Sequence, residues 1–85
     1  MRVDAEHGLE SLYRKDGERL WRAVAAYTGD REIANDAVAE AFAQALARGS
    51  ELRDPMAWIW RVAFRVAASE LKDRRRGGGS APEVI

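Results

Sequence analysis

Asp54-Pro55-Met56-Ala57-Trp58-Ile59-Trp60-Arg61-Val62-Ala63-Phe64-Arg65-Val66-Ala67-Ala68-Ser69-Glu70-Leu71-Lys72-Asp73-Arg74-Arg75-Arg76 is the stretch that decides the fold of this 85-residue chain. It begins as a helix does, because Asp54 can cap the free backbone N–H groups and Pro55 suits the first helical position. It ends in basic residues followed by the glycines 77–79, which favour the end of a helix. The stretch therefore predicts a helix over residues 55–76.

The side chains of this helix sort into two zones at about 100° per residue. The broad zone is apolar and contains Met56, Ile59, Trp60, Val62, Ala63, Phe64, Val66, Ala67 and Leu71. The narrow arc is basic with one aromatic residue and contains Trp58, Arg61, Arg65, Ser69, Lys72 and Arg76. Such an arc can neutralise phosphates and stack a base, or it can be a solvated face whose Trp is half buried. From the arc alone, the two interpretations are equally open.

Two further helices precede this one. The first is predicted from about Leu9 to Tyr27, after a flexible N-terminus over residues 1–8. Its apolar residues recur at three- and four-residue spacing, at Leu9, Leu12, Tyr13, Leu20, Trp21, Val24 and Tyr27. Gly29 can end this helix and Asp30 can cap the next, which is predicted over residues 31–48. Because the turn is short, the two helices are expected to pack antiparallel.

The helix over residues 31–48 has two contrasting sides. Its apolar side is rich in Ala and contains Ala34, Val38, Ala41, Phe42, Ala45 and Leu46. Its other side places Glu32, Asp36 and Glu40 at successive i,i+4 steps, with Gln44 next and no basic residue at the matching spacing. Like charges at this spacing destabilise a helix, so the stripe suggests a surface kept for a basic partner. Taken alone, such a stripe is more often an ordinary solvated face.

The connections complete an all-α prediction. The loop 49–53 should place Leu52 in the core and leave Arg53 in solvent. Residues 77–85 have the composition of a flexible linker, which suggests a following domain that this chain lacks. No strand pattern or repeat is visible. We therefore expect a small three-helix domain over residues 9–76, with room for an extra short N-terminal turn.

Composition narrows the function classes. Hydrophobic residues make up 47% of the chain, enough for a folded core. With no Cys and one His, His7, the chain lacks the parts for a disulfide frame, a thiolate metal site or a nucleophile–base pair. We therefore expect neither an enzyme nor a cofactor. No apolar run approaches the ~20 residues that cross a bilayer and no signal pattern is present, so we expect a soluble, cytoplasmic protein without a membrane partner.

The net charge of zero conceals an asymmetry. Residues 1–50 hold 7 basic and 9 acidic side chains, a net charge of −2, whereas residues 55–76 hold 6 basic and 2 acidic ones, a net charge of +4. One end of the chain therefore suits an anionic partner. A duplex-reading helix-turn-helix would need polar side chains at the start of its last helix. Here that position holds Met56 to Trp60, which suits melted or single-stranded DNA better.

Three segments, in order and spacing, resemble region 2 of extracytoplasmic-function (ECF) RNA polymerase sigma factors. The first is Leu12-Tyr13-Arg14, Gly17 and Arg19-Leu20-Trp21-Arg22. The second is Thr28-Gly29-Asp30-Arg31-Glu32, Ala34, Asp36-Ala37-Val38, Glu40-Ala41-Phe42 and Ala45. The third is Asp54-Pro55, Ala57-Trp58-Ile59 and Arg61-Val62-Ala63. The resemblance covers about residues 9–76.

This resemblance implies a helical module of bacterial transcription initiation with two binding surfaces. The second helix would contact the beta-prime clamp helices of the RNA polymerase core through Glu32, Asp36, Ala39, Glu40, Gln44 and Leu46. The third helix and the loop before it would capture flipped bases of the minus-ten promoter element, mainly on the non-template strand. By position, the DNA-binding residues would be Arg53, Trp58, Arg61, Arg65, Ser69, Lys72, Arg74, Arg75 and Arg76. An anti-sigma factor is a further expected partner.

Three departures from the family pattern matter. Ala39 stands where the family often has Gln, which weakens the expected clamp contact. Arg65 and Ser69 stand where it often has Asn and Asp, so base preference does not carry over. The second domain of the family, which reads the minus-thirty-five element, is not expected within these 85 residues. The rival interpretations are a helical protein-interaction module that binds only an anti-sigma factor, and a duplex-binding helix-turn-helix regulator.

Overall fold

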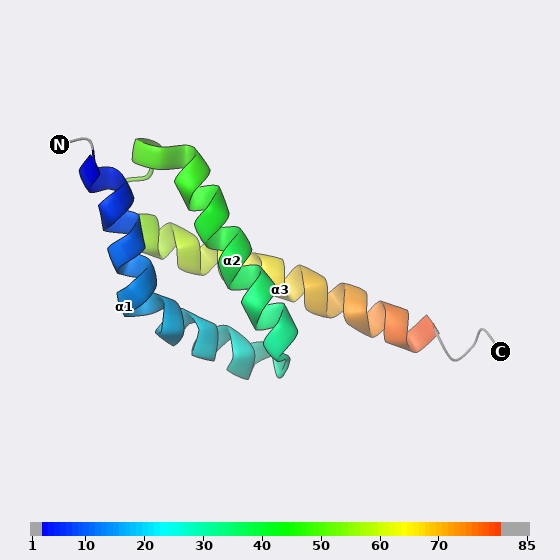
Figure 1. Cartoon of the computed structure of the whole chain (residues 1–85). Helices are drawn as coiled ribbons and strands as arrows, with labels where there is room; N and C mark the ends of the chain where they lie inside the picture. Colours follow the sequence, from blue (N-terminus) through cyan, green and yellow to red (C-terminus); the bar gives the residue numbers. More distant parts are fainter. Residues whose placement is uncertain (1–2, 81–85) are drawn as a thin grey trace.

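The fold consists of three helices, as the sequence predicts (Figure 1). The computed structural model describes the backbone of residues 3–80 and the side chains of residues 14–49 and 51–76. The elements are α1 (Val3–Thr28), α2 (Arg31–Arg48), the 3₁₀ turn η1 (Gly49–Glu51) and α3 (Pro55–Ser80). The described range contains no strand and no helix long and apolar enough to cross a membrane. The all-α prediction is therefore confirmed.

The predicted caps are present at both inner junctions. Gly29 adopts φ +69°, the left-handed conformation that a glycine takes at low cost. Asp30 Oδ1 then accepts a hydrogen bond from Ile33 N at 3.1 Å and so caps α2. Asp54 Oδ1 accepts one from Ala57 N at 3.2 Å at the start of α3. These local signals fix where α2 and α3 begin.

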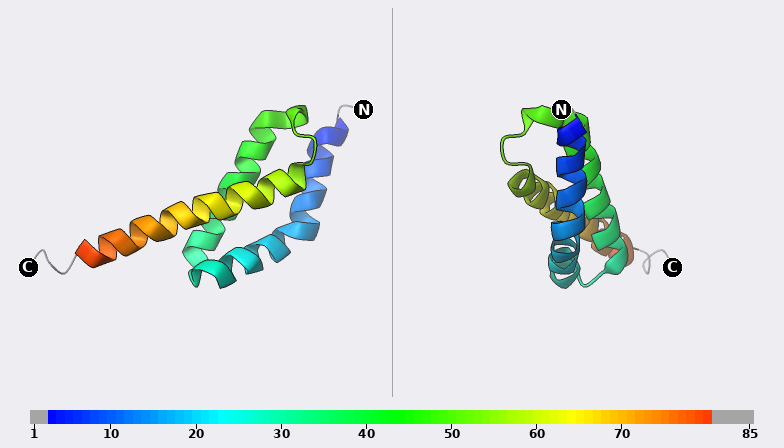
Figure 2. Two further views of the ribbon diagram at one scale, coloured as in Figure 1. Left: turned by 180° about the vertical axis from the view of Figure 1, so that it is seen from behind. Right: turned by 60° about the vertical axis from the view of Figure 1, so that its left-hand side comes forward.

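α2 is the central element of the core. It runs antiparallel to α1 and packs against both α1 and α3 (Figures 1 and 2). The buried apolar side chains are Leu20 and Val24 of α1; Ile33, Ala34, Ala37, Val38, Ala41, Phe42 and Ala45 of α2; and Ile59, Val62, Ala63 and Ala67 of α3. Because α2 supplies more than half of them, its small alanines let both neighbours approach closely. The end of α3 projects beyond the other two helices (Figure 2).

Two predicted helix boundaries were wrong. α1 begins at Val3, within the segment expected to be flexible, and no separate N-terminal turn precedes it in the described range. Acidic Asp4 and Glu6 favour a helix N-terminus, which accounts for this extension. α3 continues to Ser80 through the three glycines. Glycine weakens a helix without forbidding it, and the N–H groups of residues 77–80 pair with the last four carbonyls before them.

The burial of four residues differs from the prediction. Leu46, predicted on the apolar side of α2, is 55% exposed, and Tyr27 of α1 is 51% exposed. At about 100° per residue, Leu46 lies about 40° beyond Phe42, at the edge of the buried zone. Ile33 and Ala37 are buried on the same helix, although the sequence did not place them there. The side chains of Leu9, Leu12 and Tyr13 lie outside the described residues.

Candidate functional site

A row of polar and basic side chains runs along α3. Arg61, Arg65, Ser69, Lys72 and Arg76 are all exposed, as the arc predicts. They follow one another at spacings of four, four, three and four residues, which aligns them on one side of a helix. At about 1.5 Å per residue, the row is about 22 Å long. We call these five residues the basic row, and Arg75, which is also exposed, lies beside its end.

The cations of the basic row lack carboxylate partners. Among the described side chains, none of Arg61, Arg65, Lys72 and Arg76 forms an ion pair. By contrast, arginines of α1 are paired within their own helix: Arg19 with Asp16 at 3.6 Å, and Arg22 with Glu18 at 2.9 Å. Four unpaired cations on one face concentrate positive potential there, which suits a polyanion.

Trp58 does not stand free among these cations. It is partly buried and packs against the core. The guanidinium of Arg48, at the end of α2, lies 5.2 Å from the centroid of its ring. This is a cation–π contact, so one ring face of Trp58 is already covered. Trp58 is therefore less available for stacking than its place in the basic arc suggests, whereas Arg53 is exposed as expected.

Trp60 and Phe64 lie in the apolar zone of α3, as the spacing predicts. Both are partly buried against the core, with ring centroids 6.1 Å apart and nearly parallel planes. Phe64 also contacts Tyr27 of α1, with ring centroids 5.4 Å apart. These two aromatics therefore serve packing between α1 and α3.

Arg74 and Glu32 meet each other instead of facing outward to two different partners. Arg74 Nη1 lies 2.5 Å from Asp30 Oδ2, and its Nη2 lies 3.7 Å from Glu32 Oε1. Helical spacing puts Arg74 about 200° from Lys72, on the other side of α3. The structure therefore separates Arg74 from the basic row, although the sequence grouped them.

The outer side of α2 presents the other predicted surface. Asp36, Ala39 and Glu40 are exposed, and Gln44 Nε2 donates a hydrogen bond to Glu40 Oε2 at 2.7 Å. Asp36 forms no ion pair among the described side chains. The exposed Leu46 lies further along the same helix. We call Asp36, Ala39, Glu40 and Gln44 the α2 face.

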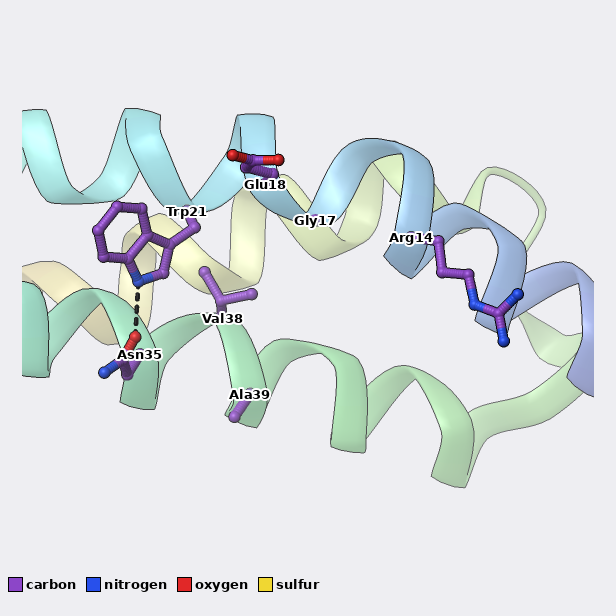
Figure 3. Close-up of a pocket in the computed structure, with 7 residues that line it drawn as sticks. All are labelled: Arg14, Gly17, Glu18, Trp21, Asn35, Val38 and Ala39. Atoms are coloured by element: carbon purple, nitrogen blue, oxygen red, sulfur yellow. Dashed lines mark hydrogen bonds between the residues drawn. The ribbon is translucent and has the colours of Figure 1, made fainter.

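A groove of about 530 Å³ lies between α1 and α2, beside the α2 face (Figure 3). A hydrogen bond joins its two walls: Trp21 Nε1 of α1 donates to Asn35 Oδ1 of α2 at 2.6 Å. The residues that line it are Arg14, Gly17, Glu18, Trp21, Asn35, Val38 and Ala39. Because a glycine and an alanine contribute to its walls, the groove leaves room for side chains of a partner.

A second groove lies between α2 and α3, on the other side of Ala39. Its residues are Asp36, Ala39, Glu40, Ala43, Val66 and Glu70. Burial raises the pKa of Glu70, and the negative charge of Asp36 raises it further. Ala39 lines both grooves, so α2 forms a low ridge between them.

Within the described residues, no group of three or more His, Cys, Asp or Glu side chains could hold a metal ion.

The sequence analysis assigned no site role to Trp21, Asn35, Arg48 and Glu70. Glu70 had a usable signal, because it lies one turn from both Val66 and Arg74 at the edge of the apolar zone. The Trp21–Asn35 and Arg48–Trp58 contacts join different helices, so the periodicity of a single helix could not predict them.

Comparison with protein families identifies this arrangement. The family model described as Sigma-70 region 2 matches residues 12–77, which is most of the chain. Searches of curated proteins and of solved structures returned no match. The family consists of helical, non-catalytic domains that act with RNA polymerase and promoter DNA. The chain belongs to the sigma-70 region 2 family, whose role is in transcription initiation.

Proposed function

We propose that this chain is the region 2 module of an ECF sigma factor that docks on polymerase through α2 and holds melted promoter DNA through α3. The observation that carries the proposal is the unpaired basic row on a member of this family. The resemblance of residues 9–76 to the ECF group supports the subgroup. Both partners belong to the bacterial cytoplasm, where we place the protein.

The basic row supports the DNA half of the proposal. The row is about 22 Å long and carries four cations, so it can neutralise several successive phosphates of one strand. Met56 to Trp60, at the start of α3, offer no polar set for reading a duplex major groove. We infer that the row holds the backbone of the unpaired non-template strand of the minus-ten element, while Arg53 and the loop beside it approach the bases.

The α2 face supports the polymerase half. Asp36 has no partner in an ion pair among the described side chains, and Ala39 keeps the ridge low between two grooves. A helical partner with basic side chains would find carboxylates on the ridge and apolar walls beside it. We infer that the beta-prime clamp helices occupy this face, with Leu46 at its end.

Strand binding tests the DNA half. We expect fluorescence anisotropy to show binding of a single-stranded minus-ten oligonucleotide that weakens with salt. Each phosphate contact contributes about 0.7 to the slope of log affinity against log salt for a single strand. Arg61→Ala plus Arg65→Ala should therefore lower affinity and reduce the slope by about 1.4. The matched control is Arg19→Ala plus Arg22→Ala on α1, which should leave the slope unchanged.

Three results would count against this assignment. Unchanged binding by the Arg61 and Arg65 variant would remove the basic row from the DNA surface. Tighter binding to duplex than to melted DNA would favour a duplex-binding regulator. A chain that binds no DNA yet binds an anti-sigma factor would be a protein-interaction module.

Clamp binding tests the polymerase half. Asp36→Arg plus Glu40→Arg should abolish pull-down of a beta-prime clamp fragment, because it replaces two attractive contacts by two repulsive ones. Helicity by circular dichroism should stay unchanged, since both side chains are exposed. Asp16→Arg plus Glu51→Arg changes the charge equally away from the α2 face and should retain pull-down. Normal pull-down by the first variant would disprove docking on α2.

A further inference from the structure

Arg74 occupies a distinct position at the end of α3. Its guanidinium contacts Asp30 Oδ2 at 2.5 Å, while the other oxygen of Asp30 accepts the capping hydrogen bond from Ile33 N at 3.1 Å. One carboxylate thus caps α2 and holds α3 at the same time. The side chain of Asp30 is only 26% exposed, so the contact is partly shielded from solvent.

Beyond Leu71, α3 leaves the core. Leu71 is the last of its apolar residues that packs against the core, and Lys72 to Arg76 are all exposed. Among the described side chains after Leu71, Arg74 alone is paired with another helix. The three glycines that follow each cost about 0.5–1 kcal/mol relative to Ala in a helix. This end of α3 therefore depends on Arg74 for its attachment.

We propose that Arg74 is a positioning residue, which Asp30 holds so that the last turns of α3 stay helical and present Lys72, Arg75 and Arg76 to the DNA strand. The inference rests on the proposed DNA-binding function of α3. It also removes Arg74 from the strand-contacting set, because the carboxylates of Asp30 and Glu32 already engage its two terminal nitrogens and neutralise its charge. Helical spacing agrees, since Arg74 lies on the opposite side from Lys72.

A double-mutant cycle on the whole chain tests this proposal. Arg74→Ala removes the cation, and Asp30→Asn removes the negative charge while keeping a residue that caps helices well. We expect each single variant to weaken single-strand binding by up to about fivefold, the range of an exposed ion pair. Because both changes break one interaction, the double variant should bind no more weakly than the weaker single one. Hydrogen exchange should accelerate at residues 72–80 in all three variants and stay unchanged at residues 56–67.

Arg75→Ala is the matched control, since Arg75 is exposed and has no ion pair among the described side chains. It should weaken binding and lower the salt slope by about 0.7, without faster exchange at residues 72–80. A direct phosphate contact by Arg74 predicts the opposite effect of Asp30→Asn on single-strand affinity. In that case, Asp30→Asn would free the guanidinium and tighten binding, and that result would overturn the proposal.

Unchanged exchange at residues 72–80 in Arg74→Ala and Asp30→Asn would overturn it as well. If the unsubstituted chain bound no DNA, the proposed function would fail. The exchange measurement would still decide whether Asp30 holds this turn.

Discussion

Glu70 is the residue whose environment departs most clearly from that of an ordinary surface carboxyl. Burial in the groove between α2 and α3 raises its pKa above the usual 4.5, and the charges of Asp36, Asp73 and Glu40 raise it further. Arg74, on the next turn of α3, acts in the other direction without outweighing them. The folded chain therefore binds this proton more tightly than the unfolded chain does.

This difference predicts how stability varies with pH. A folded-state pKa above the unfolded one means that the stabilising contribution is present below about pH 4.5 and is lost as pH rises through the folded pKa. Glu70→Gln abolishes the titration, so its stability relative to the unsubstituted chain should rise from pH 4 towards pH 7. We expect a gain of at most about 0.5 kcal/mol at pH 7, because the site is near the surface. Urea unfolding of both proteins at the two pH values measures it.

A stability difference between the two proteins that is the same at both pH values would contradict this account of Glu70. A Glu70→Gln variant that loses stability relative to the unsubstituted chain as pH rises would also contradict it. That result would mean that the attraction of Arg74 outweighs the burial and repulsion that raise the pKa of Glu70.

Arg74 and Trp58 show how far single residues can be predicted from this sequence. Their positions on α3 follow from spacing at about 100° per residue. Their partners do not, because Asp30 lies 44 residues away from Arg74 and Arg48 belongs to α2. Spacing alone therefore identified the basic row, whose cations form no ion pair among the described side chains. The sequence also grouped Arg74 with the row, and the contact of Arg74 with Asp30 was not visible in it.

At the scale of the element, local chemistry decided where helices begin. Asp30 and Asp54 each cap a helix through a bond three residues ahead, and both starts were predicted. The outer ends were not predicted, because α1 begins at Val3 and α3 reaches Ser80. Helix propensity alone sets such outer ends poorly.

α2 shows how one element serves two surfaces. Its inner side is rich in buried alanine, and its outer side carries the α2 face. The acidic stripe was visible in the sequence, but the different partners of its three acidic residues were not. Glu32 turns to Arg74, Glu40 is hydrogen-bonded to Gln44, and Asp36 stays available. The candidate clamp surface therefore begins at Asp36 and does not include Glu32. It also extends sideways from α2, because a groove lies on each side of this helix.

At the scale of the whole molecule, opposite charges are kept apart on a neutral chain. At about 100° per residue, the basic row is centred opposite Ala63 and Ala67, which are buried in the core. The α2 face belongs to the helix that packs on that buried side. The two proposed partners, which carry opposite charges, would therefore contact different faces of the molecule. The remaining interaction between the two faces is long-range, and its strength depends on salt.

The Asp36→Arg plus Glu40→Arg variant isolates this long-range term, because it shifts the net charge from 0 to +4 without touching the basic row. Charges act over about 30 Å at 0.01 M salt but only about 8 Å at 0.15 M. We therefore expect the variant to bind a single-stranded oligonucleotide several-fold more tightly at ~0.01 M salt and equally well at ~0.3 M. Asp16→Arg plus Glu18→Arg adds the same charge on α1, away from the basic row and the loop 49–53, and should behave alike in anisotropy titrations. A gain that persisted at high salt for the first variant alone would show that the strand reaches α2, and the two surfaces would then overlap.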